Sequence, residues 1–490
     1  MRILHTISKN TFEAYRCSLQ TIQLPHEQNR SIRAEDEKWD EFVIPEIKVL
    51  ALQVLVKGWK EYPILEGLPT CVDRYTLVEM LPTDLPFELV IVKIPYEHYW
   101  ERAAKDRWTH NNPGEHGNSW RQLYCERHFA DYLENLEPAF FEGQQEACNN
   151  LISLVRNYIQ TLKIRRLVPS NTSSTGPDKD DEDKLPATEL IVHHIPLNLI
   201  LPKFHQLREL YINFGMIYMN DGFEWRDFEF SVEDCVKLSR CLSDSCALKK
   251  FSLTRSNLDQ PRVAALLRGI AVNNRIEILD LSHCKLGDTG AHAVGEFLTK
   301  HRRLKELHLA NNKIGESGVA GIVYGLLQQN STPLKHLNLR LNPLRDAGGA
   351  HICGFLLRNK NIQVLNLSGC QFTGETGVGM AEIIASGYMK SFTLELDLSN
   401  NDLGPIAGEA FEVGMKTCSV ILNLDVRMCN FTKESEYSIS ESIIRNREDK
   451  KREKLGASTA RHSSVYVPLR AKSLQPPSEY KAVQERKEYD

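Results

Sequence analysis

Three features of the sequence have residue types that could carry chemistry: a group of cysteines, a pair of histidines and a glycine-rich turn. The cysteines lie close together, at Cys235, Cys241 and Cys246. A zinc site is one interpretation, but the spacing matches no familiar zinc module and follows a helical pattern, which favours buried core thiols. His193 and His194 have no accompanying pattern of metal ligands, so we expect a structural pair. The turn GETGVG (374–379) resembles a phosphate-binding loop only in its glycines.

Sequence motifs typical of enzymes are absent. The chain contains no G-x-x-x-x-G-K-[ST] loop, no H-E-x-x-H zinc helix, no EF-hand loop and no G-x-S-x-G nucleophile elbow. Carboxylates are plentiful, but the sequence alone cannot pair two of them for acid–base catalysis, so nothing in it supports hydrolase chemistry. We therefore expect no enzymatic activity, no metal, no other cofactor and no small-molecule substrate.

Composition narrows the classes of partner. The 490 residues are 42% hydrophobic and 25% charged, and 60 Lys and Arg against 64 Asp and Glu give a net charge of −4. This balance favours neither nucleic acid nor a membrane surface as a partner. No apolar run reaches the roughly eighteen residues of a membrane span, and the N-terminus lacks a secretory pattern. None of the twelve cysteines forms a C-x-x-C pair, so we expect reduced thiols and a cytoplasmic or cytoskeletal location.

The chain contains an internal repeat, whose elements must position any functional side chains. The pattern L-x-x-L-x-L-x-x-N/C-x-L recurs in seven copies, which begin at residues 248, 276, 304, 334, 362, 393 and 421. A degenerate copy precedes them at 207–215. Each repeat is long enough for a strand and a helix. The sequence therefore predicts an α/β leucine-rich-repeat horseshoe of the ribonuclease-inhibitor-like class, with parallel strands on the concave face and helices outside.

Each position of the repeat has an expected role. The fourth and sixth residues point inward. The ninth residues fill the interior and satisfy buried backbone groups, so the cysteines among them are interpreted as structural; they are Ser256, Cys284, Asn312, Asn342, Cys370, Asn401 and Cys429. The third, fifth and seventh residues face the concave side. From these positions we predict a protein-binding surface made by Asp280, His308, Asn338, Arg340, Asn366, Glu395, Asp397, Asp425 and Arg427.

Two points about this concave surface stay open. The residues could equally be the ordinary solvated face of a sheet, because exposed strand positions are polar in any case. If they do bind a partner, we expect Asp397 and Asp425 to face solvent and to form, with Glu395, an acidic patch that steers a partner of opposite charge.

Changes in local amino-acid composition predict five segments. They are an irregular N-terminal lead (1–34), a mainly α-helical domain (35–168), a flexible charged linker (169–186), the repeat domain (187–445) and a basic, largely disordered tail (446–490). The tail is expected to begin as a helix that runs to about Lys454.

Motifs outside the leucine pattern carry a more specific resemblance. They are YWERAAKDRW (99–108), GNSWRQLYCERHFADYLENL (117–136), FEWRDFEFSVEDC (223–235), LKKFSLTRSNLD (248–259) and ESEYSISESIIRNRE (434–448). From about Glu35 to Glu453 the chain resembles the leucine-rich-repeat subunit family of the axonemal nexin–dynein regulatory complex, the T-complex-associated testis-expressed family. The lead before Glu35 and the tail after Lys454 share nothing with that family.

The resemblance implies a function that composition and spacing do not. It implies a non-enzymatic structural and regulatory subunit in the axoneme of motile cilia and flagella. Its partners would be the other, coiled-coil subunits of the complex, in the neighbourhood of the doublet microtubules and inner-arm dynein. The complex bridges neighbouring doublets and regulates dynein-driven sliding, and the family is needed for normal flagellar beating.

The main alternative is an F-box-like substrate adaptor of a ubiquitin ligase. Segment 77–108 carries LP-x-x-LP-x-x-L and a late tryptophan, an outline that resembles a weak F-box placed before leucine-rich repeats. Pro86 and Pro95 interrupt its helices and make the match poor. Its apolar residues could instead pack the helical domain against itself; they are Leu81, Leu85, Leu89 and Ile91. An innate-immune sensor, a third class, would need a nucleotide-binding module, and the sequence has none.

Overall fold

The computed structural model describes residues 46–167, 194–214, 230–328, 333–359, 361–387 and 393–463. The chain divides into two compact units at the bond between Asp106 and Arg107. This division falls inside the range 35–168 that the sequence assigned to one helical domain. The lead (1–34) and the linker (169–186) lie outside the described residues.

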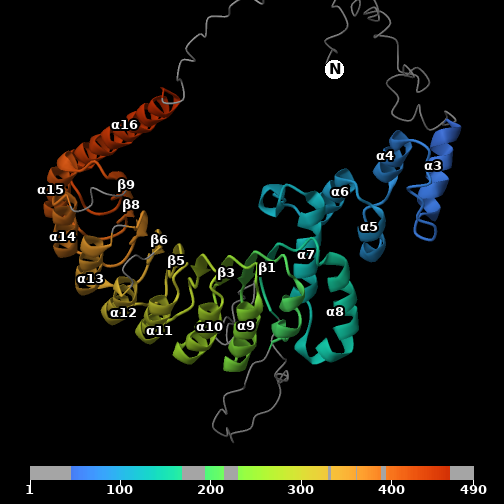
Figure 1. Ribbon diagram of the computed structural model, residues 1–490, viewed down its shortest axis with the longest axis horizontal. Helices are drawn as coiled ribbons and strands as arrows, with labels where there is room; N and C mark the ends of the chain where they lie inside the picture. The colour runs from blue at the N-terminus through green and yellow to red at the C-terminus, as the bar shows by residue number, and fades with distance from the viewer. Residues whose placement is uncertain are drawn as a thin grey trace, which may run out of the picture. The chain divides into compact units, whose positions relative to one another are not determined.

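The first unit is helical in its described part. Its helices are α3 (Ile47–Gly58), α4 (Cys71–Met80), α5 (Phe87–Lys93) and α6 (Glu97–Arg107) (Figure 1). Pro86 caps the start of α5 and Pro95 follows its end, so the two prolines separate short helices as expected. The Trp100 side chain is buried, and its indole N–H donates to the Ile94 carbonyl at 3.0 Å. Residues 77–106 of the F-box-like segment thus contribute to the core of this unit.

The second unit begins with two helices and a strand that the leucine pattern did not reveal. Helix α7 (Trp120–Glu134) and helix α8 (Phe141–Val155) are followed by strand β1 (Thr161–Ile164). The buried residues Leu162 and Ile164 alternate on β1 as the fourth and sixth residues of a repeat do. The repeat array therefore starts within the range that was expected to be mainly helical.

The strands of the second unit form one parallel sheet in chain order. Strand β1 is followed by β2 (Glu209–Ile212), β3 (Lys250–Leu253), β4 (Ile278–Asp280), β5 (Glu306–His308), β6 (His336–Asn338), β7 (Val364–Asn366), β8 (Leu394–Asp397) and β9 (Ile421–Asp425). The degenerate copy at 207–215 supplies β2. The fourth-position leucines stand side by side from strand to strand, as at Leu307, Leu337 and Leu365, and all three are buried. This register confirms the repeat alignment.

Each strand from β2 onward is followed by a helix on the outer side of the curved sheet (Figure 1). These helices are α9 (Val232–Asp244), α10 (Gln260–Val272), α11 (Gly287–Lys300), α12 (Glu316–Leu327), α13 (Arg345–Arg358), α14 (Gly374–Ala385), α15 (Gly404–Thr417) and α16 (Lys433–Ser463). Helices α11 and α12 can approach closely because Gly295 and Gly325 have no side chain. A Cβ atom at either position would collide with the backbone of the other helix. The predicted α/β leucine-rich-repeat horseshoe, preceded by a helical region, is confirmed.

Helix α16 crosses the boundary expected between the repeats and the tail. It begins at Lys433 and ends at Ser463, beyond the expected limit near Lys454. Residues 464–490 lie outside the described part of the chain. Among the described helices, none is both long enough and apolar enough to cross a membrane.

Candidate functional site

The ninth-position side chains form a buried ladder along the second unit. All seven are less than 3% exposed: Ser256, Cys284, Asn312, Asn342, Cys370, Asn401 and Cys429. Asn342 illustrates the bonding. Its Oδ1 accepts from the backbone N–H groups of Asn312 (2.8 Å) and Ile314 (3.1 Å), and its Nδ2 donates to the carbonyls of Leu309 (2.9 Å) and Leu339 (2.7 Å). One amide thus satisfies four buried backbone groups in neighbouring turns.

Cysteines take the place of asparagine at three rungs. Each Sγ of Cys284, Cys370 and Cys429 donates to a strand carbonyl of the preceding repeat at 3.1–3.3 Å. Burial raises the pKa of Cys284 and of Cys370 to about 12, and that of Cys429 to about 11. These thiols are therefore protonated donors at neutral pH, a state suited to structure and unsuited to nucleophilic attack.

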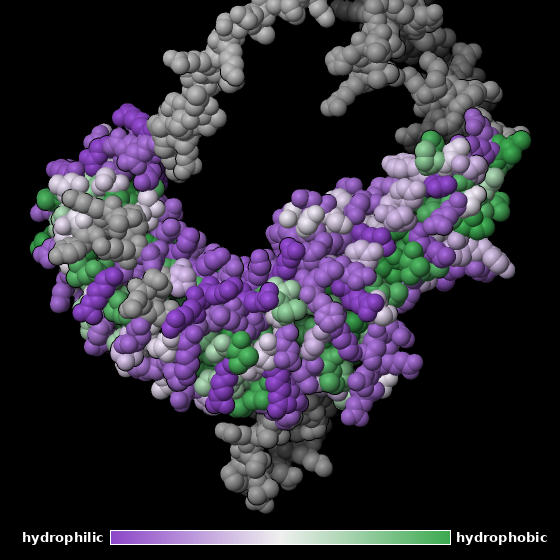
Figure 2. Space-filling model, viewed as in Figure 1, coloured by the Kyte–Doolittle hydropathy of each residue, from purple (hydrophilic) through white to green (hydrophobic). Residues whose placement is uncertain are grey.

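The fifth-position side chains of the predicted surface fold back onto their own turns. Each uses Oδ1 to accept the backbone N–H two residues later, at 3.0–3.1 Å, in the pairs Asp280–Ser282, Asn338–Arg340, Asn366–Ser368, Asp397–Ser399 and Asp425–Arg427. This is the Asx-turn geometry. All five are half-buried, and the inner side of the repeats is lined by hydrophilic residues (Figure 2). The fifth position therefore shapes the concave face and also ends each strand.

The acidic end of the concave face is partly neutralised. Asp397 accepts from Asn366 Nδ2 at 2.8 Å and from Ser399 Oγ at 2.7 Å. Arg427 Nε lies 2.9 and 3.1 Å from the two oxygens of Asp425, and these hydrogen bonds lower the pKa of the Asp425 carboxyl. Glu395 on β8 is exposed. The structure thus brings the predicted acidic residues to one end of the sheet but pairs one of them with Arg427.

The middle of the concave face carries histidines around one carboxylate. Glu306 on β5 lies 3.5 Å from His308 Nε2 on the same strand and 3.6 Å from His336 Nδ1 on β6. Arg340, which follows β6, is exposed. The predicted residues His308, Asn338 and Arg340 therefore lie on neighbouring strands of one surface.

Helix α7 closes the first edge of the sheet with carboxylates that the repeat pattern did not indicate. Glu126 Oε1 accepts from the backbone N–H groups of Gln160 (2.8 Å) and Thr161 (2.7 Å), and its other oxygen bonds His116. Two turns later, Glu134 Oε1 accepts from the Arg165 N–H at 2.7 Å. Both carboxylates are buried, and burial raises the pKa of Glu134. Their spacing of eight residues on an otherwise apolar helix face is the signal that could have found them.

Helix α16 closes the opposite edge with donors. Asn446 Nδ2 donates to the Ile421 carbonyl at 3.0 Å, and Arg447 Nε donates to the Leu422 carbonyl at 2.6 Å. Arg447 also reaches the side chain of Asn423 at 3.0 Å. The backbone groups bonded in this way are not available for pairing with a strand of another protein.

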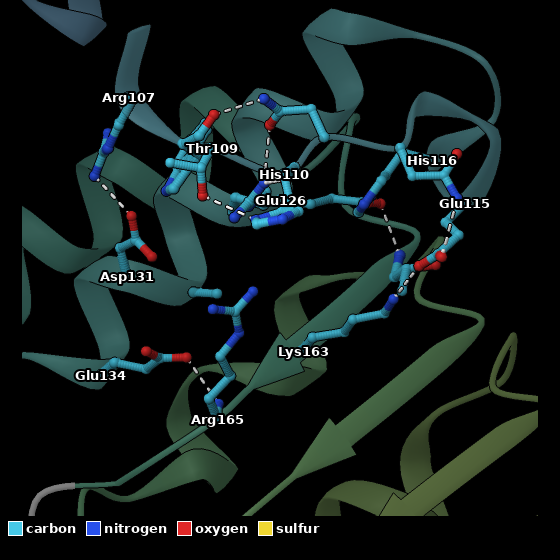
Figure 3. Close-up of a pocket in the computed structure, with 16 residues that line it drawn as sticks. Arg107, Thr109, His110, Glu115, His116, Glu126, Asp131, Glu134, Lys163 and Arg165 are labelled. Atoms are coloured by element: carbon cyan, nitrogen blue, oxygen red, sulfur yellow. Dashed lines mark hydrogen bonds and ion pairs between the residues drawn. The ribbon is translucent and has the colours of Figure 1, made fainter. Parts of the chain in front are cut away.

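A pocket of about 850 Å³ lies beside the first edge, where residues 107–116, helix α7 and strand β1 meet (Figure 3). Ion pairs cross it between Arg107 and Asp131 (2.9 Å) and between Lys163 and Glu115. The side chain of Arg165 extends from the end of β1 toward the interior of this pocket (Figure 3). Sequence reasoning did not single out any of these residues.

The three features with possible chemistry are built into the fold. Cys235 and Cys241 are buried in α9, whereas Cys246 is exposed. His194 is buried with its Nδ1 3.2 Å from Asp234, a carboxylate partner that the sequence did not indicate; His193 lies outside the described residues. Within the described ranges, no group of three or more His, Cys, Asp or Glu side chains could bind a metal ion.

The glycine-rich turn at 374–379 opens helix α14, and a carboxylate already occupies its backbone donors. Asp346 Oδ1 accepts from the N–H groups of Thr373 (2.9 Å) and Thr376 (3.4 Å), and its side chain also bonds both threonine hydroxyls. The turn is therefore capped from the preceding repeat, as expected for a strand-to-helix turn of the array.

Comparison with known proteins supports the repeat and the resemblance. The Leucine Rich repeat family model matches residues 272–295, 300–323, 330–353, 358–381 and 390–411. Three relatives are each named dynein regulatory complex subunit 5. The mouse protein is 32% identical over 273 residues and the human protein 29% over 273, each match covering 54% of both chains. The protein of Chlamydomonas reinhardtii is 29% identical over 223 residues, 45% of this chain and 50% of the relative.

The matches cover only part of each protein. The chain spans about half the length of the curated relatives it matches. The named relatives and the matched repeats confirm the resemblance to a leucine-rich-repeat subunit of the dynein regulatory complex.

Proposed function

We propose that this chain is a non-enzymatic scaffold subunit of the nexin–dynein regulatory complex in the axoneme of motile cilia and flagella. In this role it contributes to a bridge between neighbouring doublet microtubules and to the regulation of dynein-driven sliding. The observation that carries the proposal is the similarity to relatives named dynein regulatory complex subunit 5 in both a mammal and a green alga.

Features of the second unit support a scaffold role. Both outer strands of the sheet are bonded to helices of the same chain, through Glu126 and Glu134 at one edge and Asn446 and Arg447 at the other. A repeat array of this kind offers a broad surface for partner proteins. The thiols of the interior ladder have raised pKa values and serve as hydrogen-bond donors, which suits a structural part.

The concave face is the surface we propose for partner subunits. Its fifth positions are polar, and charged residues at the third, fifth and seventh positions differ in sign along the array, from Lys250 on β3 to Glu395 and Asp397 on β8. A pattern of charges of both signs can orient an elongated partner and set its register. Coiled-coil subunits of the complex are partners of this elongated kind.

Localisation together with copurification tests the proposal. A tagged chain expressed in a ciliated cell is expected in the axonemal fraction after detergent and salt extraction, and to copurify with other subunits of the regulatory complex. A chain that stays in the soluble fraction and copurifies with the linker protein of a ubiquitin ligase would overturn it in favour of the F-box-like adaptor.

A further inference from the structure

The pocket beside helix α7 contains two arginines that form no ion pair among the described residues. Four cationic side chains line it: Arg107, Arg127, Lys163 and Arg165. Arg107 pairs with Asp131, and Lys163 pairs with Glu115. Among the described residues, neither Arg127 nor Arg165 has a carboxylate within ion-pair distance. The pocket therefore holds two guanidinium groups outside any ion pair, in a space large enough for a ligand. The charge of Asp131 acts on Arg127 and that of Glu134 on Arg165 from beyond ion-pair distance.

The other acidic residues of the pocket are committed elsewhere. Glu126 accepts the backbone N–H groups of Gln160 and Thr161, and Glu134 accepts that of Arg165. Both carboxylates are buried against the strand that they close. They cannot turn toward the guanidinium groups without leaving strand N–H groups unsatisfied.

Arg127 is fixed in place before any ligand arrives. Its Nη1 donates to the His110 carbonyl (2.7 Å) and to Asn111 Oδ1 (2.9 Å), and its guanidinium lies over the Trp108 ring, 4.4 Å from the centroid. Burial, followed by the nearby charge of Arg165, lowers the pKa of Arg127. Two guanidinium groups that repel each other in a partly buried pocket are stabilised by an anion that contacts both.

A further cation continues this surface onto the concave face. Lys163 and Lys250 both lie over the Tyr211 ring, with their Nζ atoms 5.5 and 5.0 Å from its centroid. Lys163 stands opposite Tyr211 in the sheet, and Lys250 lies on the next strand. Among the described residues, Lys250 has no carboxylate within ion-pair distance, and Glu209, which accepts from the Tyr211 hydroxyl, stands opposite it on β2. Cationic side chains thus run from the pocket onto the first and third strands, with Glu209 between them on the second.

We propose that this pocket, with Arg127 and Arg165 as its anion-binding groups and Lys250 on β3 as a third group outside its lining, binds an acidic peptide segment of a partner protein. One carboxylate of the peptide sits between the two guanidinium groups, and a second reaches Lys250 along the strand ends. The inference does not depend on which complex the chain joins.

The chemistry favours a peptide over a nucleic acid. Trp108 is the aromatic ring best placed for stacking on a base, but Arg107 and Arg127 lie over it, 4.8 and 4.4 Å from its centroid. The carboxylates of Glu115 and Asp131 also line the pocket and would repel a continuous phosphate backbone. Separate carboxylates on a flexible chain can contact the free cations and avoid these two acids.

Fluorescence anisotropy of a labelled glutamate-rich peptide, titrated with the full chain at low salt, tests the proposal. The variants are Arg165→Gln and Lys250→Gln, because neither side chain bonds the protein's own backbone in the described structure. Arg358→Gln, on the outer helix α13, is the matched control. Each test variant is expected to weaken binding about tenfold, as for the loss of one charge-assisted hydrogen bond, while the control binds as the unchanged chain does. Circular dichroism of each variant confirms that the fold is intact.

Three results would overturn the proposal. They are no saturable binding of the glutamate-rich peptide, equal weakening by Arg358→Gln, and displacement of the peptide by a single-stranded oligonucleotide at lower concentration than by unlabelled peptide. Absence of saturable binding would mean that the pocket does not bind the peptide. Equal weakening by the control would mean that binding reflects only general charge attraction. Stronger competition by the oligonucleotide would mean that the ligand is a nucleic acid. Inorganic phosphate at millimolar concentration is expected to compete weakly, since it can fill only the space between the two guanidinium groups.

Discussion

Glu126 Oε1 lies 2.7 Å from the backbone nitrogen of Thr161, and this hydrogen bond joins helix α7 to the first strand of the sheet. The opposite edge is bonded by Asn446 Nδ2, 3.0 Å from the Ile421 carbonyl oxygen. A carboxylate thus accepts strand N–H groups at one edge, and an amide donates to a strand carbonyl at the other. Each repeat of an array is covered only by its neighbours, so the first and last repeats each have one side that no repeat covers. Closing elements are needed to cover these two sides.

The first prediction concerns the carboxylate that closes the sheet. Glu126→Ala is expected to lower the free energy of unfolding by about 3–5 kcal/mol, because it leaves two strand N–H groups without an acceptor and removes the partner of His116. Glu126→Gln keeps an acceptor oxygen and should lose less. Urea unfolding followed by circular dichroism measures both, with the exposed Glu146→Ala on α8 as control. Equal midpoints for Glu126→Ala and the control would contradict this account.

The second prediction concerns the buried ladder. Asn342→Ala is expected to lower the free energy of unfolding by about 3 kcal/mol, since it leaves buried N–H and carbonyl groups of neighbouring turns without a partner. Asn342→Cys should lose less, because a thiol at the same position of the next repeat, Cys370, donates to the Leu339 carbonyl. Asn274→Ala, at an exposed site, is the control for the same unfolding measurement. The account fails if the alanine and cysteine variants at 342 unfold alike.

The third prediction concerns thiol reactivity. A thiol reagent applied to the native chain at pH 8, with each site read by mass spectrometry, is expected to modify the exposed Cys71 and Cys246. Cys284, Cys370 and Cys429 should react only after unfolding, because burial raises the pKa of each thiol and leaves almost no thiolate. Modification of any ladder cysteine as fast as Cys246 would return these residues to the class of reactive thiols.

The fourth prediction concerns acid stability. Burial, with the charge of Arg107 beside it, lowers the pKa of His128 to about 4. Between pH 6.5 and 4 the unfolded chain takes up a proton at this residue and the folded chain does not, so stability falls as the pH falls through this window. The loss is at most about 3 kcal/mol, and above pH 6.5 the residue has no effect.

A comparison of melting temperatures at pH 7.5 and pH 5 tests the contribution of His128. His128→Gln retains an acceptor for Arg107, whose Nη1 lies 2.7 Å from Nδ1 of the histidine, but cannot be protonated. The variant should lose less stability between the two pH values than the unchanged chain. His205→Gln, at an exposed position, should lose as much as the unchanged chain. An identical acid response in His128→Gln would assign the effect to other groups.

The sequence indicates the repeats well because their signal is local and periodic. Leu307 and Leu309 alternate on a strand, and Asn312 follows at a fixed distance, so the repeat and its burial can be read without coordinates. Strand β1 escaped notice because a leucine, Leu167, stands where the pattern requires Asn or Cys. The spacing of the repeats therefore identified the array but placed its start after β1.

The closing elements and the pocket could not be read in this way, because their partners are distant in sequence. Glu126 and Thr161 lie 35 residues apart, and Arg447 and Leu422 lie 25 apart, with no repeating spacing to relate them. The Asx-turns at the fifth position were also missed. An aspartate at a strand end looks the same in sequence whether its carboxylate meets solvent or its own backbone.

The last prediction concerns the acidic end of the concave face as a binding surface for partner subunits. Asp397 and Asp425 each accept a backbone N–H in their own turns, so a lysine at either position removes a structural bond as well as a charge. Asparagine keeps the Oδ1 acceptor and removes only the charge. The double variant Asp397→Asn with Asp425→Asn is therefore the informative one, and it also releases Arg427 from its ion pair.

This double variant is expected to fold normally and to enter the reconstituted regulatory complex about tenfold less readily, because complementary charge steers association. The matched control is Glu375→Gln with Glu409→Gln, two exposed carboxylates on the outer helices α14 and α15. Reconstitution with the partner subunits, quantified by size-exclusion chromatography, measures the difference. Normal assembly of the asparagine variant, with circular dichroism unchanged, would move the partner site off this end of the concave face. The cationic surface around Arg165 and Lys250 would then be the next candidate, because neither side chain forms an ion pair among the described residues whereas Asp425 does.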